Sequence, residues 1–94
     1  MQVVWSSGFK RSFKKITKRN PQLRDRITEV LMLLAEDPFT PSLKSHKLTG
    51  NLEGLWSCSV AYDCRIIFEF SENNDDLEVF ILIINIGNHD EVYG

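Results

Sequence analysis

The feature that most constrains the fold of this chain is a long apolar run, Leu77–Ile86, which stops at Gly87. Apolar residues fill consecutive positions instead of alternating with polar ones, a pattern typical of a strand buried on both faces. A rigid strand of this kind would hold the side chains beyond its end in place, as catalytic groups require. The segment beyond it is Asn88, His89, Asp90, Glu91, Val92 and Tyr93.

Two amphipathic helices are predicted in the first half of the chain. Ser6 or Ser7 is a good N-cap for a helix that runs to about Lys18. In Asn20-Pro21, an asparagine cap precedes a proline at the favoured first helical position, which predicts a second helix that ends near Asp37. The connection is very short, so we expect an antiparallel helix hairpin.

The remaining segments have the composition of strands joined by tight turns. Consecutive strands with short connections usually pair, so the last three should form an antiparallel meander. A polar loop, Ser71–Asp76, separates the last two of them. The expected strands are Gln2–Trp5, Leu55–Ala61, Cys64–Phe70 and Leu77–Ile86.

These elements predict an α+β fold of order β-α-α-β-β-β, as one domain over residues 1–94. The helix hairpin should cover one face of a small, mainly antiparallel sheet, since neither layer can bury its apolar side alone. The other face of the sheet would then be open to a ligand. No apolar stretch approaches the ~20 residues of a membrane span, and a cytoplasmic location without membrane contact is expected.

Charge is distributed unevenly along the chain. Residues 1–26 hold eight basic residues and one acidic residue, whereas residues 27–94 hold three basic and twelve acidic ones. The net charge of −2 therefore hides a strong dipole. A basic first third can dock on nucleic acid or on an acidic protein segment, or it can form a solvated helix face.

The two cysteines, Cys58 and Cys64, are interpreted as small buried residues on neighbouring strands. A Cys2His2 metal site with His46 and His89 is the alternative. The spacing of the cysteines matches none of the usual zinc patterns, so no metal and no cofactor is expected.

Several unusual polar groups fall near the ends of the predicted strands. Asp63 lies at the turn between the first two meander strands, and Arg65 follows inside an apolar segment. His89 and Tyr93 come after the last strand, and His46 precedes the first. In an antiparallel meander the ends of neighbouring strands adjoin, so these groups could meet at one region of the sheet. Taken singly, each also suits a structural role, such as pairing of Arg65 with Glu69.

Three motifs of the chain resemble the RelE/ParE superfamily of toxins from bacterial toxin–antitoxin pairs, and most of all its YafQ branch. The resemblance covers nearly the whole chain. The motifs are His46-Lys47-Leu48-x-Gly50-x-Leu52-x-Gly54-x-Trp56, Asp63-x-Arg65-Ile66-Ile67-Phe68, and the ending from Ile86 to Tyr93.

The resemblance implies a RelE-like fold and a ribosome-dependent endoribonuclease that cuts mRNA without a metal. It also implies a cognate antitoxin, bound in a heterotetramer, whose disordered segment folds across the domain. A histidine of YafQ-like members is replaced by Ser59. The implied catalytic residues are His46, Asp63, Arg65, His89 and Tyr93, and the implied RNA contacts are Lys44, Lys47 and Arg65.

The chemistry of RNA cleavage suits these residue types. A base must remove the 2′-hydroxyl proton, a cation must stabilise the developing phosphorane, and an acid must protonate the leaving 5′-oxygen. We expect His89 as the acid and Arg65 as the phosphate clamp, with either Asp63 or His46 as the base. Tyr93 could stack on a nucleobase or donate a proton.

Two other functions remain open. A ParE-like protein would inhibit DNA gyrase and cut nothing, but ParE-like members lack the histidine and arginine set present here. A catalytically inactive member would serve only as an antitoxin-binding module.

Overall fold

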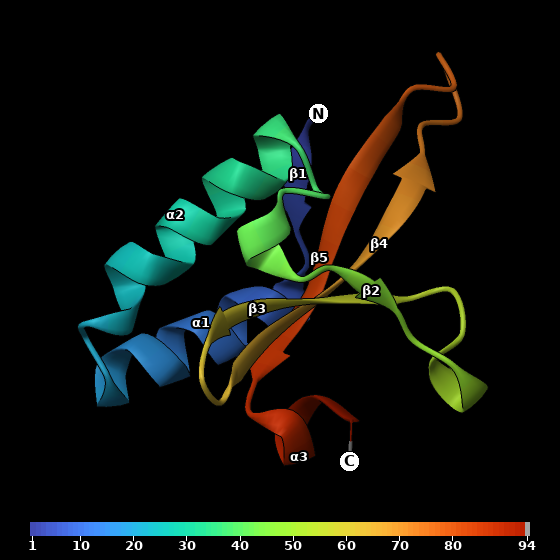
Figure 1. The fold of residues 1–94 in the computed structure, drawn as a ribbon. Helices are drawn as coiled ribbons and strands as arrows, with labels where there is room; N and C mark the ends of the chain where they lie inside the picture. Colours follow the sequence, from blue (N-terminus) through green and yellow to red (C-terminus); the bar gives the residue numbers. More distant parts are fainter. Residues whose placement is uncertain (94) are drawn as a thin grey trace.

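The computed structural model describes residues 1–93 and shows an α+β fold in which helices lie against a twisted sheet (Figure 1). The predicted order β-α-α-β-β-β is confirmed, with two short elements added: a strand at His46–Lys47 and a C-terminal helix. Short 3-10 turns occupy Pro41–Leu43 and Gly50–Leu52. The main elements are β1 (Val3–Trp5), α1 (Ser7–Arg19), α2 (Leu23–Glu36), β2 (His46–Lys47), β3 (Trp56–Ala61), β4 (Cys64–Glu72), β5 (Val79–Gly87) and α3 (His89–Tyr93).

The five strands form one mixed sheet in the order β1-β5-β4-β3-β2. β3, β4 and β5 are the predicted antiparallel meander, and β2 extends it by pairing antiparallel with β3. β1 adds in parallel to β5, with Val3 opposite Ile81. The first and last predicted strands therefore lie side by side in the sheet, as Figure 1 shows.

The hydrophobic core lies between the helix hairpin and one face of the sheet. Phe9 of α1, Ile27 and Leu34 of α2, and Phe68 and Ile83 of the sheet are all fully buried there. The predicted cap of α1 is confirmed at Ser6, whose hydroxyl accepts from the Phe9 amide at 3.0 Å. The same hydroxyl donates to the Ile84 carbonyl at 3.0 Å, so the cap also attaches α1 to β5.

The predicted start of the second helix is wrong by two residues. Asn20 does not cap α2; it ends α1, and its amide donates to the Ile16 carbonyl at 2.9 Å. Pro21 lies in the connecting turn, and α2 begins at Leu23, whose amide donates to the Asn20 carbonyl at 3.0 Å. The backbone of Asn20 is thus used on both sides of the turn, and its side-chain Oδ1 accepts from Gln22 Nε2 at 2.9 Å instead of capping α2.

The last strand differs from its prediction in two respects. Leu77 is exposed and left-handed, with φ of 60°, and it belongs to the hairpin turn, so β5 begins at Val79. Burial is also not equal on both faces: Ile81 and Ile83 are fully buried, whereas Leu82 and Ile84 are half-buried. The helix hairpin covers one face of β5 completely, and the opposite face is covered only in part.

Within residues 1–93, no helix is both long enough and apolar enough to cross a membrane.

Candidate active site

The candidate site lies on the sheet face that the helix hairpin leaves uncovered. On β3, Cys58 and Val60 point into the core, so Ser57 and Ser59 face the opposite way. Arg65 of β4 pairs directly with Ser59 and shares that face. Alternation along β3 and at the start of β4 thus leaves Ser57, Ser59 and Arg65 on this face, while Cys58, Val60 and Ile66 join the core.

An open hollow of about 500 Å³ lies at this face. It is formed by β2 and the segment after it, by β4, and by α3 at the end of the chain. Its lining includes two histidines, a tyrosine and two cationic side chains. The lining residues are His46, Lys47, Leu48, Thr49, Leu52, Arg65, His89 and Tyr93.

His46 is positioned by the pairing of β2 with β3, where it lies opposite Ser57. Its Nδ1 is 3.0 Å from the Lys44 carbonyl oxygen. A carbonyl can only accept a hydrogen bond, so this contact assigns the proton of the neutral ring to Nδ1. The Nε2 lone pair then remains available to accept a proton from a substrate.

Arg65 is held by the turn that joins β3 and β4. Its Nη1 donates to the Ala61 carbonyl at 3.0 Å and to the Tyr62 carbonyl at 3.3 Å, and it is 3.5 Å from the Ser59 hydroxyl. No ion pair joins it to Glu69 within the described part of the chain. Within residues 1–93, no ion pair offsets the charge of the guanidinium beside the hollow.

His89 and Tyr93 are brought together by α3. Their rings meet edge to face with centroids 4.5 Å apart, and the Tyr93 hydroxyl donates to the buried Ser57 hydroxyl at 2.5 Å. The His89 side chain itself is 74% exposed, so it can reach a substrate in the hollow. The tyrosine thus attaches α3 to the sheet and supports the histidine.

α3 begins with a reciprocal cap that sequence reasoning missed. The Glu91 amide donates to Asn88 Oδ1 at 2.8 Å, and the Asn88 amide donates to Glu91 Oε1 at 2.9 Å. The spacing Asn-x-x-Glu is the sequence signal of such a capping box. Glu91 folds back over Gly87, where an added Cβ would lie 2.9 Å from Glu91 Cβ, so only glycine fits there without a shift.

Asp63 is not among the residues that line the hollow. Its Oδ1 accepts from the backbone amide of His89 at 3.5 Å, a long contact at the start of α3. The carboxylate thus lies at the first residue of α3, next to the backbone of His89 and outside the lining of the hollow.

The two lysines expected to contact RNA take different positions. Lys47 lies opposite Trp56, and its ammonium is 5.7 Å from the centre of that indole ring, a cation–π contact. Lys47 also lines the hollow, while Trp56 packs against the core. Lys44 is exposed and lines a second hollow next to the first.

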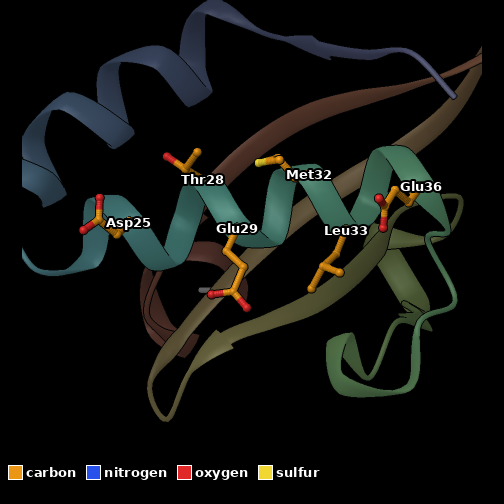
Figure 2. Close-up of a pocket in the computed structure, with 6 residues that line it drawn as sticks. All are labelled: Asp25, Thr28, Glu29, Met32, Leu33 and Glu36. Carbon is orange, nitrogen blue, oxygen red and sulfur yellow. The ribbon is translucent and has the colours of Figure 1, made fainter.

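Another hollow, of about 390 Å³, lies along the outer surface of α2 (Figure 2). It carries three carboxylates and no cationic side chain, which does not suit an RNA substrate. Its six lining residues all come from α2: Asp25, Thr28, Glu29, Met32, Leu33 and Glu36.

Both cysteines are buried, as predicted. Burial raises the pKa of Cys58 to about 12 and that of Cys64 to about 11, so both thiols stay protonated at neutral pH. In residues 1–93 no group of three or more histidine, cysteine, aspartate or glutamate side chains is arranged to hold a metal ion.

Solved bacterial toxins share this fold. E. coli YafQ (strain BL21(DE3)) is similar, with a TM-score of 0.79 and 16% identity over 99% of this chain and 98% of that one. The YoeB/ParE toxin from Agrobacterium tumefaciens is also similar, with a TM-score of 0.76 and 19% identity over 95% of this chain and 99% of that one. A chain of the E. coli DinJ–YafQ complex has a TM-score of 0.69 and 21% identity over 99% of this chain and 98% of that one.

The chain belongs to the YafQ family, the bacterial toxins of type II toxin–antitoxin systems, which it matches over residues 1–94. No curated protein sequence matches it at a significant level.

Proposed function

We propose that this toxin is a ribosome-dependent mRNA endoribonuclease that acts in the cytoplasm. One observation carries the proposal: His46, Arg65, His89 and Tyr93, from three separate segments of the chain, line one open hollow. The combination supplies a base, a cation, an acid and a stacking ring, which are the groups that cleavage of RNA by its own 2′-hydroxyl requires.

In the proposed reaction, His46 acts as the base. Its Nδ1–H bond to the Lys44 carbonyl leaves Nε2 to take the proton of the 2′-hydroxyl as the oxygen attacks the adjacent phosphorus. The bond from phosphorus to the 5′-oxygen then breaks, and protonated His89 gives its proton to that oxygen. The products are a 2′,3′-cyclic phosphate and a 5′-hydroxyl.

Arg65 stabilises the charge that develops on the phosphorane oxygens. The carbonyls of the β3–β4 turn hold Nη1, so the guanidinium is oriented before substrate binds. Asp63 serves as a positioning residue, since its contact is with the backbone of His89. Tyr93 positions α3 and offers an aromatic face on which a nucleobase can stack.

The partner in this proposal is a small antitoxin protein that binds the toxin in a heterotetramer and blocks the hollow. The DinJ–YafQ pair, a complex of a similar toxin, supports the expectation of a protein partner. The exposed basic surface of α1 offers a complementary site for an acidic segment of such a partner.

The test is cleavage of mRNA in a translating extract, with mapping of the new 5′ ends. The wild-type protein should produce cuts positioned by codons, and Arg65→Ala and His89→Ala should each reduce the rate by at least a hundredfold. Arg24→Ala is the matched control, because its guanidinium lies over Phe13, 5.7 Å from the ring centre, in the helix hairpin.

Three outcomes would contradict the proposal. Cleavage that persists in both Arg65→Ala and His89→Ala would exclude the assigned site. Inhibition of gyrase supercoiling without new 5′ ends would indicate the ParE-like function. Absence of both activities, with antitoxin binding intact, would indicate a binding module.

A further inference from the structure

A second hollow, of about 650 Å³, lies beside the first at the end of the β3–β4 hairpin. His46 and Arg65 line both hollows and therefore form the wall between them. An RNA strand whose scissile phosphate lies at these two residues can therefore extend into both hollows. The second hollow is lined by Arg26, Ser42, Lys44, His46, Ser59, Val60, Ala61, Tyr62 and Arg65.

The charge of this hollow differs from that of the chain. Arg26, Lys44 and Arg65 are cationic, His46 can become so, and none of the lining residues is a carboxylate. The whole chain, by contrast, has thirteen acidic and eleven basic residues. Cations gathered without carboxylates attract an anion, and Ser42 and Ser59 add hydroxyl donors to the same wall.

Arg26 is brought to the hollow by an irregularity of the sheet. The register of β3 against β4 shifts between Ser59 and Ala61, so Val60 has no partner on β4. The Nε of Arg26 donates to the Val60 carbonyl at 2.8 Å. Arg65 is bound to the next carbonyl, that of Ala61. Two arginines from distant parts of the chain are thus oriented by consecutive carbonyls.

One carboxylate competes for Arg26. Nη1 of Arg26 is 3.1 Å from Oε1 of Glu29, one turn along α2. The pair is partly exposed, with side-chain exposures of 36% and 62%, so its net contribution is small. The Arg26 guanidinium therefore lies at the hollow with one exposed carboxylate beside it, and a bound anion would compete with that carboxylate.

We propose that the second hollow binds the phosphate next to the scissile one, with Arg26 and Lys44 as its cations. The inference rests on the proposed ribonuclease function, since it places the scissile phosphate at Arg65. The hollow that contains His89 and Tyr93 then takes the reacting nucleotide, and the second hollow holds the backbone of its neighbour.

The experiment measures binding of short RNAs made uncleavable by a 2′-deoxy group at the scissile position. A trinucleotide carries the flanking phosphate, and a dinucleotide lacks it. Each phosphate contact on a single strand contributes about 0.7 to the slope of log K against log salt. Arg26→Gln and Lys44→Gln should each lower the slope for the trinucleotide, the double variant should lower it by about 0.7 in total, and the dinucleotide should be unchanged.

Two variants separate a phosphate contact from a structural role of Arg26. Arg26→Lys keeps the charge and should retain the salt slope, and Arg24→Gln, on the same helix, should behave as wild type. Glu29→Gln removes the competing carboxylate and should tighten trinucleotide binding, a gain that a folding defect cannot produce.

The subsite is refuted if Arg26→Gln matches Arg24→Gln, if dinucleotide binding weakens equally, or if Glu29→Gln gives no gain. Failure of the proposed function gives a different result. In that case the wild-type protein would cut no mRNA in a translating extract but would still bind the trinucleotide with the expected dependence on Arg26. The anion site would then stand, and the ribonuclease function would be refuted.

Discussion

Replacing Gly87 with alanine should detach α3 from the sheet while the core stays folded. The added Cβ would lie 2.9 Å from Glu91 Cβ and 3.0 Å from its Oε1. Contacts this short are not tolerated, so the Glu91 side chain and backbone must move. That movement breaks the two reciprocal hydrogen bonds between Glu91 and Asn88 that begin the helix.

The cost can be worked from the bonds that are lost. A helix cap contributes about 1 kcal/mol, and the hydrogen bond from Tyr93 to Ser57 contributes about 1 kcal/mol more. α3 has five residues, too few to persist as an isolated helix, so loss of its cap also loses its docking. A total of about 2 kcal/mol lowers the ratio of docked to undocked α3 by roughly thirtyfold.

Hydrogen exchange measured by NMR reports this ratio. The Val92 amide donates to the Asn88 carbonyl at 3.1 Å, so its protection should fall by roughly thirtyfold. Amides in the centre of β4 should keep their protection. Gly8→Ala is the matched control: its Cβ would lie 3.4 Å from the Ile84 carbonyl oxygen, at the edge of ordinary contact, so α3 should be unaffected.

Unchanged Val92 protection in Gly87→Ala would refute the reasoning. So would an equal loss in a Glu91→Gly background, because that variant lacks the atoms that the new methyl group would meet. Weaker cleavage should accompany the loss of protection, since His89 is carried by the same helix.

Three further predictions concern stability and the support of the site. Tyr93→Phe leaves the buried Ser57 hydroxyl without its partner and should cost about 1 kcal/mol of docking, visible as faster exchange in α3; unchanged exchange would contradict the contact. Ser6→Ala removes the cap of α1 and should lower the free energy of unfolding in urea by about 1–2 kcal/mol, whereas equal stability would show that the cap contributes nothing. Burial raises the thiol pKa from 9.0 to about 12 for Cys58 and about 11 for Cys64. The raised pKa values contribute stability that is complete below about pH 9 and is lost as pH rises through 11 and 12. Urea titrations at alkaline pH should show a smaller loss of unfolding free energy in the double variant Cys58→Ala/Cys64→Ala than in the wild type. An equal loss would show that other groups cause it.

The helices and the meander were predictable because their signals are local. The spacing of Phe9, Phe13 and Ile16 indicates a helix that buries one side, and Pro38 limits the next helix. The predicted starts of α2 and β5 were wrong, because contacts of the backbone outweighed the preference of the side chain there. Asn20 has the side chain of an N-cap, yet its backbone ends α1, and Leu77 has the side chain of a strand residue but lies in the turn.

The candidate site was predictable only as a set of residue types. The motifs placed His46, Arg65 and His89 near strand ends, and the structure brings them to one hollow. Asp63 belonged to the same set, but it faces the start of α3 instead. Arg26 gave no signal of its own among eight basic residues, because its place depends on a shift in the β3–β4 register.

The sequence by itself determined the elements, the apolar faces and the chemistry available, since periodicity and residue type act over a few positions. Only the tertiary structure decided which groups meet. The parallel pairing of β1 with β5, the edge strand that holds His46, and the docking of α3 through Tyr93 all join residues far apart in the chain. Such contacts form when the packed core sets register and orientation, and no local pattern encodes that choice.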